Sequence, residues 1–359
     1  MKIFVLLSRF PYPLEKGDKL RAYHQIRQLS KNHEIVLCAL SATKVSAANY
    51  DELKKFCKEI HIIKLNNIQI FFNLLAGLIF SRHPLQVAYF YSKSNHRKIK
   101  ALIKKSKPDR IYCQLIRVTE FVKDIPSMPK TLDYMDALSS GMERRWQTAK
   151  FYLKPFLKIE ALRLKRYEHF IFNHFENKTI ISEQDRQLIV NANNDDIAVV
   201  PNGVNFDYFH PKEEVEKEYD LLFTGNMSYP PNVLGVLYIV NQILPHIHKI
   251  KPDCKLIIAG ATPHPAVKAL ASKKVIVTGW VDDIRGYYWK SKVMLAPMQI
   301  GSGLQNKLLE ALAMRLPCVT SKLANNALHA IENQQILIGE HSEDYAEKVL
   351  QLLQDKQYA

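Results

Sequence analysis

Several features that assign a protein class at once are missing from this sequence of 359 residues. No pair of cysteines has the spacing of a metal site or of a small disulfide framework. Each cysteine lies in or beside an apolar run, as buried free thiols do; they are Cys38, Cys57, Cys113, Cys254 and Cys318. The histidines also lack ligand spacing, so no metal centre is indicated. We expect a reducing compartment, the cytoplasm.

A long hydrophobic run is missing as well. The longest apolar stretch, residues 68–80, has 13 residues and is interrupted by Gln69 and Asn73. A membrane-spanning helix needs about 20. The first eight residues show no small-residue cleavage site and are typical of a first strand. We therefore expect a chain that does not cross a membrane, with the 47% hydrophobic and 24% charged residues of a soluble globular protein.

The familiar nucleotide and hydrolase motifs are missing too. No G-x-G-x-x-G follows the first apolar run, which argues against a nicotinamide-dependent dehydrogenase. No G-x-x-x-x-G-K-[ST] is present, so a P-loop is excluded, and no serine elbow or Cys/His constellation points to a hydrolase.

What the chain has in excess is positive charge, +15 at neutral pH. Three interpretations compete: a nucleic-acid binder, an enzyme at a membrane surface, or a soluble basic protein. No nucleic-acid motif supports the first, because the basic residues are scattered rather than set along one recognition helix. Anionic lipid attracts nearby basic residues by about 1 kcal/mol each. The second and third interpretations both remain open.

Strand-like and helix-like patterns alternate from end to end. Continuous apolar strands between helices predict parallel sheets covered on both faces, an α/β fold. Strands are expected at 2–8, 34–40, 60–65, 110–114, 130–134, 178–181 and 197–200, and in a second series at 219–224, 254–259, 275–277, 293–296, 317–320 and 335–338. Two series predict two doubly wound domains.

The division between the domains is expected at the turn signal Pro201-Asn202-Gly203. This gives domains 1–200 and 201–359. Among the expected helices are 19–30, 150–174, 232–250, 304–314 and 345–353. On helix 150–174 we expect an exposed charged face formed by Glu160, Arg163, Lys165, Arg166 and Glu168.

The segment 293–321 is the most informative part of the chain. It predicts a buried strand, a loop with Gly301 and Gly303, a helix from Leu304, and another buried strand. Backbone N–H groups at a helix start bind phosphate well. Glu310 lies about 9 Å along the axis from that start, about the reach from a diphosphate to its ribose hydroxyls, from which a carboxylate accepts hydrogen bonds. The alternative for Lys307 and Glu310 is an intrahelical pair.

Glycine loops after other strands are further candidates, because ligands of doubly wound domains bind beyond the carboxyl ends of the strands. Gly17 follows the first strand of the first domain, and Gly225 follows that of the second. Asn232 is expected to cap the next helix. Gly260 and the segment Gly279 to Asp282 end two more strands. The alternative for Gly17 is a surface loop with an ordinary helix entry, and the alternative for Gly260 and Gly279 is an ordinary strand-to-helix turn.

Together these segments resemble the family 4 glycosyltransferases. The matching residues run in order through nearly the whole chain: Arg9-Phe-Pro-Tyr-Pro13 with Lys16-Gly17-Asp18, Val200-Pro-Asn-Gly-Val204, Phe223-Thr-Gly-Asn-Met227, Leu256-Ile-Ile-Ala-Gly260, Gly279-Trp-Val-Asp282, and Gly301 to Met314 with Pro317. The resemblance implies the GT-B fold of two facing Rossmann-like domains. It also implies an acceptor-binding N-terminal domain, a nucleotide-sugar-binding C-terminal domain, and transfer with retention of anomeric configuration and without a tightly bound metal or cofactor.

The sequence departs from the family pattern in two places. Of the family's two glutamates, Glu310 matches the second, which holds the donor ribose, whereas Ser302 stands where the first would be. Asn226 and Asn232 stand where the family often has an Arg and a Lys. We expect Lys307, with the helix start, to supply the missing neutralisation of the diphosphate.

In the first domain, Asp136 follows a strand and resembles an acidic position of related transferases. It is expected to orient the sugar or the acceptor hydroxyl; the alternative is a helix N-cap. Arg117 and Glu120 are weaker candidates. The expected catalytic residues are thus Asp136, Lys307 and Glu310, and the expected donor-binding residues are Gly17, Gly225, Asn226, Gly260, Val281, Gly301, Ser302, Gly303, Leu304, Gln305 and Asn306.

The expected function is transfer of a sugar from a UDP- or GDP-linked donor to a glycan or lipid-linked saccharide, in cell-surface polysaccharide synthesis. Peripheral contact with the anionic inner face of the cell membrane is the further expectation, motivated by the apolar stretch 68–80 and the basic surface. No nucleic-acid partner is expected. A sugar-nucleotide epimerase of the same shape and a non-catalytic nucleotide-sugar-binding protein are the alternatives. Base, sugar, acceptor and oligomeric state are not specified by the sequence.

Overall fold

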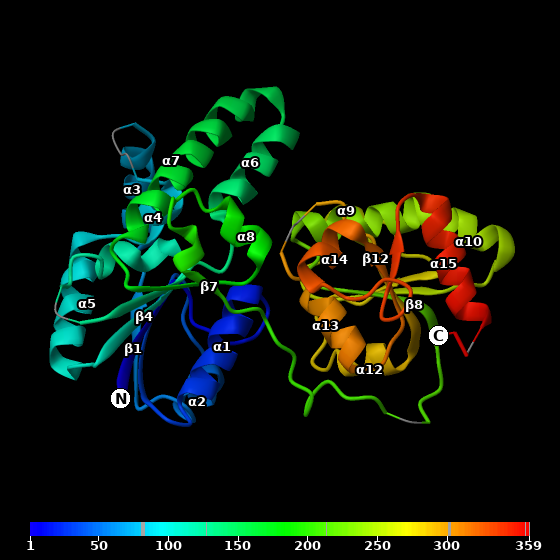
Figure 1. The fold of residues 1–359 in the computed structure, drawn as a ribbon, viewed down its shortest axis with the longest axis horizontal. Helices are drawn as coiled ribbons and strands as arrows, with labels where there is room; N and C mark the ends of the chain where they lie inside the picture. The colour runs from blue at the N-terminus through cyan, green and yellow to red at the C-terminus, as the bar shows by residue number, and fades with distance from the viewer. Residues whose placement is uncertain (80–82, 127, 213, 301–302, 356, 359) are drawn as a thin grey trace. The chain divides into compact units, whose positions relative to one another are not determined.

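The computed structural model describes residues 1–359 except 80–82, 127, 213, 301–302, 356 and 359. The chain divides into two units, Met1–Pro201 and Asn202–Ala359. Each unit holds one parallel β-sheet with helices packed against it (Figure 1). The α/β fold of two doubly wound domains is therefore confirmed. The sequence placed the division one residue earlier, after residue 200.

The N-terminal sheet has seven strands in the order β3-β2-β1-β4-β5-β6-β7. The strands are β1 (Lys2–Leu7), β2 (Glu34–Ser41), β3 (Glu59–Lys64), β4 (Arg110–Gln114), β5 (Lys130–Asp133), β6 (Asn177–Ile180) and β7 (Ile197–Val199). The α-helices of this unit are α1 (Gly17–Leu29), α2 (Ala47–Lys54), α3 (Asn67–Ile79), α4 (Leu85–Phe90), α5 (Lys93–Ser106), α6 (Leu138–Thr148), α7 (Lys154–Phe172) and α8 (Glu183–Leu188), with 3-10 turns η1 (Ile116–Phe121), η2 (Phe151–Leu153) and η3 (Asn194–Asp196).

The C-terminal sheet has six strands in the order β10-β9-β8-β11-β12-β13. The strands are β8 (Tyr219–Thr224), β9 (Leu256–Ala259), β10 (Val275–Val277), β11 (Ser291–Ala296), β12 (Cys318–Ser321) and β13 (Leu337–Gly339). The helices are α9 (Pro230–Tyr238), the π-helical η4 (Ile239–Ile243), α10 (Leu244–Ile250), α11 (Pro265–Lys268), α12 (Arg285–Trp289), α13 (Asn306–Ala313), α14 (Lys322–Leu328) and α15 (Ser342–Gln354).

Continuous apolar strands fold this way because both faces of each sheet are covered. On β1, Phe4 and Leu6 join one hydrophobic core, and Ile3, Val5 and Leu7 join the core on the opposite face. Successive side chains of a strand point to opposite faces, so only an uninterrupted apolar run fills both cores. All thirteen predicted strands are present, with ends shifted by at most two residues.

Two predicted helices differ from expectation near prolines. The helix expected at 232–250 runs without a break from Pro230 to Ile250 as α9, the π-helical η4 and α10, and Pro245 lies in the first turn of α10. The helix expected at 150–174 begins only at Lys154, with Pro155 in its first turn. Proline has no N–H for the helical ladder and is tolerated in the first turn, which explains both boundaries.

The expected charged face of α7 is partly wrong. Lys165 and Arg166 are exposed, but Glu160 and Glu168 are buried. Glu160 Oε1 accepts a hydrogen bond from the Leu85 N–H (2.8 Å) at the start of α4. Glu168 Oε1 accepts one from the Ser139 N–H (3.0 Å) at the start of α6. Both carboxylates satisfy N–H groups at the starts of other helices, where negative charge is favoured.

The five cysteines are buried free thiols. None of the helices in the described residues is at once long and apolar enough to span a bilayer.

Two glycines at the carboxyl ends of β8 and β9 allow a very close backbone approach. Gly225 and Gly260 have φ angles of +146° and +151°. A Cβ atom added at Gly260 would lie 1.8 Å from the carbonyl oxygen of Gly225. Only glycine combines this φ with this contact, so the two loops meet backbone to backbone.

We predict that Gly260→Ala destabilises the C-terminal domain by about 3 kcal/mol or more, because the added methyl group overlaps a backbone oxygen. Gly286→Ala is the matched control: a Cβ there has open space, and alanine favours the α12 helix by up to about 1 kcal/mol. Urea denaturation of both variants measures the effect. An unchanged midpoint for Gly260→Ala would refute the close packing.

Candidate functional site

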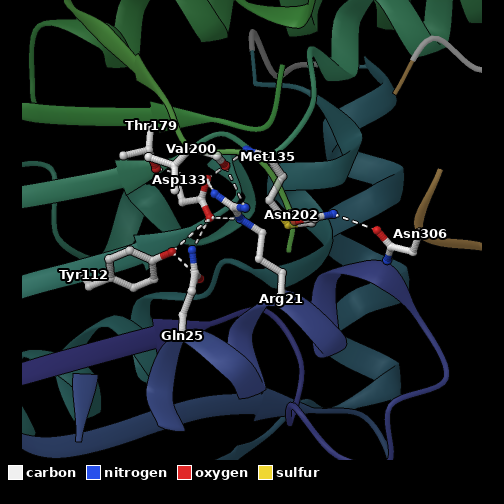
Figure 2. Close-up of polar contacts among 9 residues, drawn as sticks. All are labelled: Arg21, Gln25, Tyr112, Asp133, Met135, Thr179, Val200, Asn202 and Asn306. Carbon is white, nitrogen blue, oxygen red and sulfur yellow. Dashed lines mark hydrogen bonds and ion pairs between the residues drawn. The ribbon is translucent and has the colours of Figure 1, made fainter. Parts of the chain in front are cut away.

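The predicted phosphate loop leads into α13 at the carboxyl end of β11. Gly301 and Ser302 lie outside the described residues. Gly303 and Leu304 follow, and Gln305 is the N-cap of α13, although its side chain does not cap the helix. Instead, Gln305 Nε2 donates to the Gly303 carbonyl (2.9 Å). Asn306 Oδ1 accepts a hydrogen bond from Asn202 Nδ2 (3.1 Å; Figure 2). The helix thus begins two residues later than predicted.

Lys307, in the first turn of α13, is only 7% exposed. Its Nζ donates to Asn232 Oδ1 (2.6 Å) and lies 3.6 Å from Met298 Sδ. The Phe223 ring centroid is 4.2 Å away, a cation–π distance. Burial lowers the pKa of Lys307 to about 7, although the charge of Glu310 acts in the opposite direction. The hydrogen-bond and ring partners of this ammonium are thus neutral, and the charge that acts on it is that of Glu310.

Glu310, one turn further along α13, is held by Tyr288. The Tyr288 hydroxyl donates to Glu310 Oε2 (2.7 Å) and lies 2.8 Å from Thr224 Oγ1. Burial raises the pKa of Glu310 to about 7. The hydrogen bonds of Lys307 and Glu310 go to groups on other elements, so the intrahelical pair is not what holds either side chain.

Asn232 does not cap a helix, contrary to expectation. The N-cap of α9 is Tyr229, and Pro230 starts the helix. Asn232 Nδ2 donates to the Asn226 carbonyl (2.9 Å), while its Oδ1 accepts from Lys307. Asn226 Oδ1 accepts from Thr262 Oγ1 (2.8 Å). A chain of hydrogen bonds therefore links the loops after β8 and β9 to α13.

Most predicted donor-binding residues of the C-terminal unit follow the carboxyl ends of the strands of its sheet. Gly225 and Gly260 pack together, and the Gly260 N–H donates to the Gly279 carbonyl (3.2 Å), two residues before the partly exposed Val281. Tyr288 was missed. It lies in α12, and no local pattern distinguishes it from a tyrosine of the core.

Gly17 and Asp136 belong to the N-terminal unit. Gly17 is the first residue of α1. Asp136 is exposed, and the N-cap of α6 is Ala137, so the capping alternative is wrong. Desolvation by the surrounding protein, and then the charges of Asp185 and Asp133, raise the pKa of Asp136 to about 7 even though its side chain reaches solvent. A carboxyl group with such a pKa can exchange a proton near neutral pH.

A buried polar network in the N-terminal unit is centred on Asp133 (Figure 2). Asp133 is fully buried and accepts hydrogen bonds from Arg21 Nε (2.6 Å) and Nη2 (3.2 Å). Its other donors are Tyr112 (2.9 Å), Thr179 (3.0 Å), Gln25 Nε2 (3.2 Å) and the Met135 N–H (3.3 Å). Arg21 Nη1 also donates to the Val200 carbonyl (2.9 Å). The network joins α1 and three strands to the end of the unit, so its role is to stabilise the fold.

Several known proteins are similar to this chain in sequence or in structure. Residues 218–355 match the family model described as Glycosyl transferases group 1. An uncharacterised 44.6 kDa protein in the cps region of Klebsiella pneumoniae is 24% identical over 97% of this chain and 92% of its own length.

Two solved structures show the same fold at low identity. Sucrose-phosphate synthase from Thermosynechococcus elongatus has a TM-score of 0.72 at 12% identity, covering 100% of this chain and 91% of that one. Anabaena HepE in complex with UDP-glucose has a TM-score of 0.65 at 12% identity, covering 99% and 91%. The chain has the GT-B fold and resembles GT-B glycosyltransferases, and the family match supports a glycosyltransferase.

We predict that Asp133→Ala destabilises the N-terminal domain by about 3–5 kcal/mol, because it leaves the buried Arg21 guanidinium without its counter-charge. Asp195→Ala, at a side chain that is 88% exposed, should change stability by no more than about 0.5 kcal/mol. Guanidinium denaturation compares the two variants. Equal midpoints would show that the network contributes nothing.

Proposed function

We propose, starting from the resemblance to GT-B glycosyltransferases, that this chain is a retaining glycosyltransferase. It moves a sugar from a UDP- or GDP-linked donor to a glycan or lipid-linked saccharide in cell-surface polysaccharide synthesis. The family match of the C-terminal unit supports the reaction class. The UDP-glucose complex of HepE supports the donor class, and the cps-region relative supports the role in polysaccharide synthesis.

The observation that carries the proposal is the position of Lys307. Its ammonium is buried against an amide, a thioether and an aromatic ring. A buried charge with neutral partners is costly, and an anion beside it offsets that cost. The diphosphate of a nucleotide, placed against the backbone from Gly303 to Asn306, supplies such an anion and meets the positive end of α13.

Glu310 binds the ribose in this proposal. Tyr288 occupies Oε2, so Oε1 accepts the ribose hydroxyls. Because α13 begins at Asn306, Glu310 lies about 6 Å along the axis from its first residue. The diphosphate must therefore contact Gly303 and Gln305, ahead of the helix, to keep the span of about 9 Å expected from the sequence.

Catalysis follows from the same groups. As the glycosidic bond breaks, negative charge grows on the departing diphosphate. Lys307 and the start of α13 stabilise that charge in the transition state, which is the main catalytic contribution. Asp136, whose pKa lies near 7, orients the sugar or takes the acceptor proton. The N-terminal domain binds the acceptor, and the C-terminal domain binds the donor.

We assign the protein to the cytoplasm, with peripheral contact at the inner face of the membrane. Five buried free thiols support a reducing compartment, and the net charge of +15 supports contact with anionic lipid.

An NMR assay with donor alone and with saccharide acceptors tests the reaction. Transfer to an acceptor is the expected result. Turnover of the donor into its epimer without any acceptor would make the chain an epimerase. Binding without hydrolysis, transfer or epimerisation would make it a binding protein.

We predict that Glu310→Ala weakens UDP-glucose binding at least tenfold, because the ribose loses its acceptor. Calorimetry measures the affinity. Glu347→Ala, which removes an exposed carboxylate from α15, is the control and should bind as the parent does. Unchanged affinity in a folded Glu310→Ala variant would remove Glu310 from the site.

We predict that affinity for UDP-glucose is highest near pH 7. In the free protein the pKa values of Lys307 and Glu310 are both about 7. The diphosphate favours charged Lys307, so affinity falls above pH 7 as this proton is lost. The ribose favours ionised Glu310, so affinity falls below pH 7 as the carboxylate is protonated. Each limb approaches a tenfold change per pH unit.

In Glu310→Gln the acidic limb should disappear while the alkaline limb remains. Calorimetry between pH 5.5 and 8.5 follows both limbs. A flat profile for the parent, or an acidic limb that survives in the variant, would contradict these roles.

A further inference from the structure

The N-terminal unit contains a cavity of about 700 Å³ at the carboxyl ends of β1 and β2. It is lined by residues from the loops after these strands, from α3 and α4, and by Arg117 after β4. Its charged lining is strongly biased, with five cations and one carboxylate: Arg9, Lys16, Lys19, Lys44, Arg117 and Glu15. Lys19 is 3.6 Å from Glu15, and Arg9 is 2.6 Å from Asp18. The bias predicts an anionic ligand.

Arg117 is the most informative of these cations. It is partly buried, and its Nε and Nη2 both donate to Gln86 Oε1 (3.0 and 2.8 Å). Gln86 is neutral, and within the described chain no ion pair joins Arg117 to a carboxylate. Burial, and then the charge of Arg9, lower the pKa of Arg117 to about 10, although the charges of Asp18 and Asp136 act in the opposite direction, so it is still a cation at pH 7. A planar guanidinium in this state is well suited to a phosphate group.

Part of the cavity lining is apolar and belongs to α3 and α4. Leu74 of α3 and Leu85 of α4 line the cavity. Phe71 and Leu78 are the i−3 and i+4 neighbours of Leu74 on the helix surface. They belong to a stripe on α3 that is 44–69% exposed and consists of Ile68, Phe71, Phe72, Leu75 and Leu78. An exposed apolar stripe of this size marks a binding surface for an apolar partner.

A basic residue, Arg163, lies at the end of this stripe. Arg163 of α7 donates to the carbonyls of Gly77 (2.9 Å) and Leu78 (3.3 Å), which ties α7 to the end of α3. Phe156 and Ile159, seven and four residues before Arg163, are exposed on the same face of α7. Between residues 144 and 166 the chain has eight Lys or Arg and one acidic residue, Glu160, which is buried. Apolar contact and positive charge therefore occur side by side.

We propose that this cavity binds the phosphate-bearing head of a lipid-linked saccharide acceptor, and that the exposed stripe of α3 binds its hydrocarbon chain. Arg117, with Arg9 and Lys44, contacts the phosphate. The inference rests on the proposed transferase function and gives its acceptor a chemical class: an anionic amphiphile rather than a free neutral glycan.

Dodecyl phosphate, below its micelle concentration, is the probe for the full-length protein, with inorganic phosphate and dodecyl maltoside as the comparison ligands. Calorimetry should show dodecyl phosphate binding at least tenfold more tightly than either. Arg117→Gln should weaken dodecyl phosphate binding at least tenfold, and Arg117→Lys should retain part of it. Phe71→Ser with Phe72→Ser should reduce the affinity for dodecyl phosphate to that for inorganic phosphate.

Arg110→Gln is the matched control. Arg110 is exposed at the opposite end of the same strand, β4, so this variant loses the same charge and should bind dodecyl phosphate as the parent does. Lys44→Gln removes a cavity cation and leaves the hydrogen bonds between Arg117 and Gln86 unchanged. This variant tests the proposal if Arg117→Gln fails to fold. It should weaken dodecyl phosphate binding as well.

Equal binding of dodecyl phosphate and dodecyl maltoside, or no effect of Arg117→Gln and Lys44→Gln, would overturn the proposal. The parent and both variants could instead bind anionic vesicles equally and show no specific binding of dodecyl phosphate. That result would mean that the protein binds a membrane surface only, and it would also overturn the proposal. UDP-glucose binding, measured in the same samples, reports on the donor site separately. A parent protein that binds neither UDP nor GDP in these samples would refute the transferase and not the cavity.

Discussion

The C-terminal domain is organised around one ammonium group that has been taken out of water. Lys307 reaches from the first turn of α13 into a space bounded by Asn232, Met298 and Phe223, none of which carries a charge. The cost of this placement appears as the lowered pKa of the lysine. The contact with Asn232 fixes α13 against the first turn of α9, and α13 in turn presents Glu310 to Tyr288. A bound diphosphate stabilises the charged form of Lys307, because it gives the ammonium a counter-charge at the end of the helix where anions are favoured.

The N-terminal domain uses two arginines in opposite ways. Arg21 is buried against Asp133, which also collects hydrogen bonds from Tyr112 and Thr179, so the charge is balanced within the fold. Arg117 is held in place by the amide of Gln86, a neutral partner that orients the guanidinium without forming an ion pair. A charge paired within the fold stabilises structure, whereas an oriented guanidinium without an ion pair is available to a ligand. Each domain thus has a cation that neutral partners hold in place: Arg117 in the N-terminal domain and Lys307 in the C-terminal domain.

The strands, and the position of Lys307 and Glu310 on the same helix, could be predicted from the sequence. They depend on local patterns: apolar runs, glycine loops and helical spacing. The contacts that complete the site were not. Tyr288 is 22 residues from Glu310 in the chain, and no spacing rule joins them. Asn232 was assigned to a helix cap because its type favours that position; the preceding prolines start α9 earlier and release its side chain for Lys307. The burial of Glu160 and Glu168 was missed because their partners, the starts of α4 and α6, lie 75 and 29 residues away.

A crystal structure of the protein with UDP or GDP tests the central claim most directly. The account predicts that the diphosphate lies within hydrogen-bond distance of Lys307 Nζ and of the backbone between Gly303 and Asn306, and that the ribose hydroxyls contact Glu310. A nucleotide bound elsewhere, or a Lys307 that keeps its contact with Asn232 while the start of α13 is covered by other side chains of the protein, would contradict it.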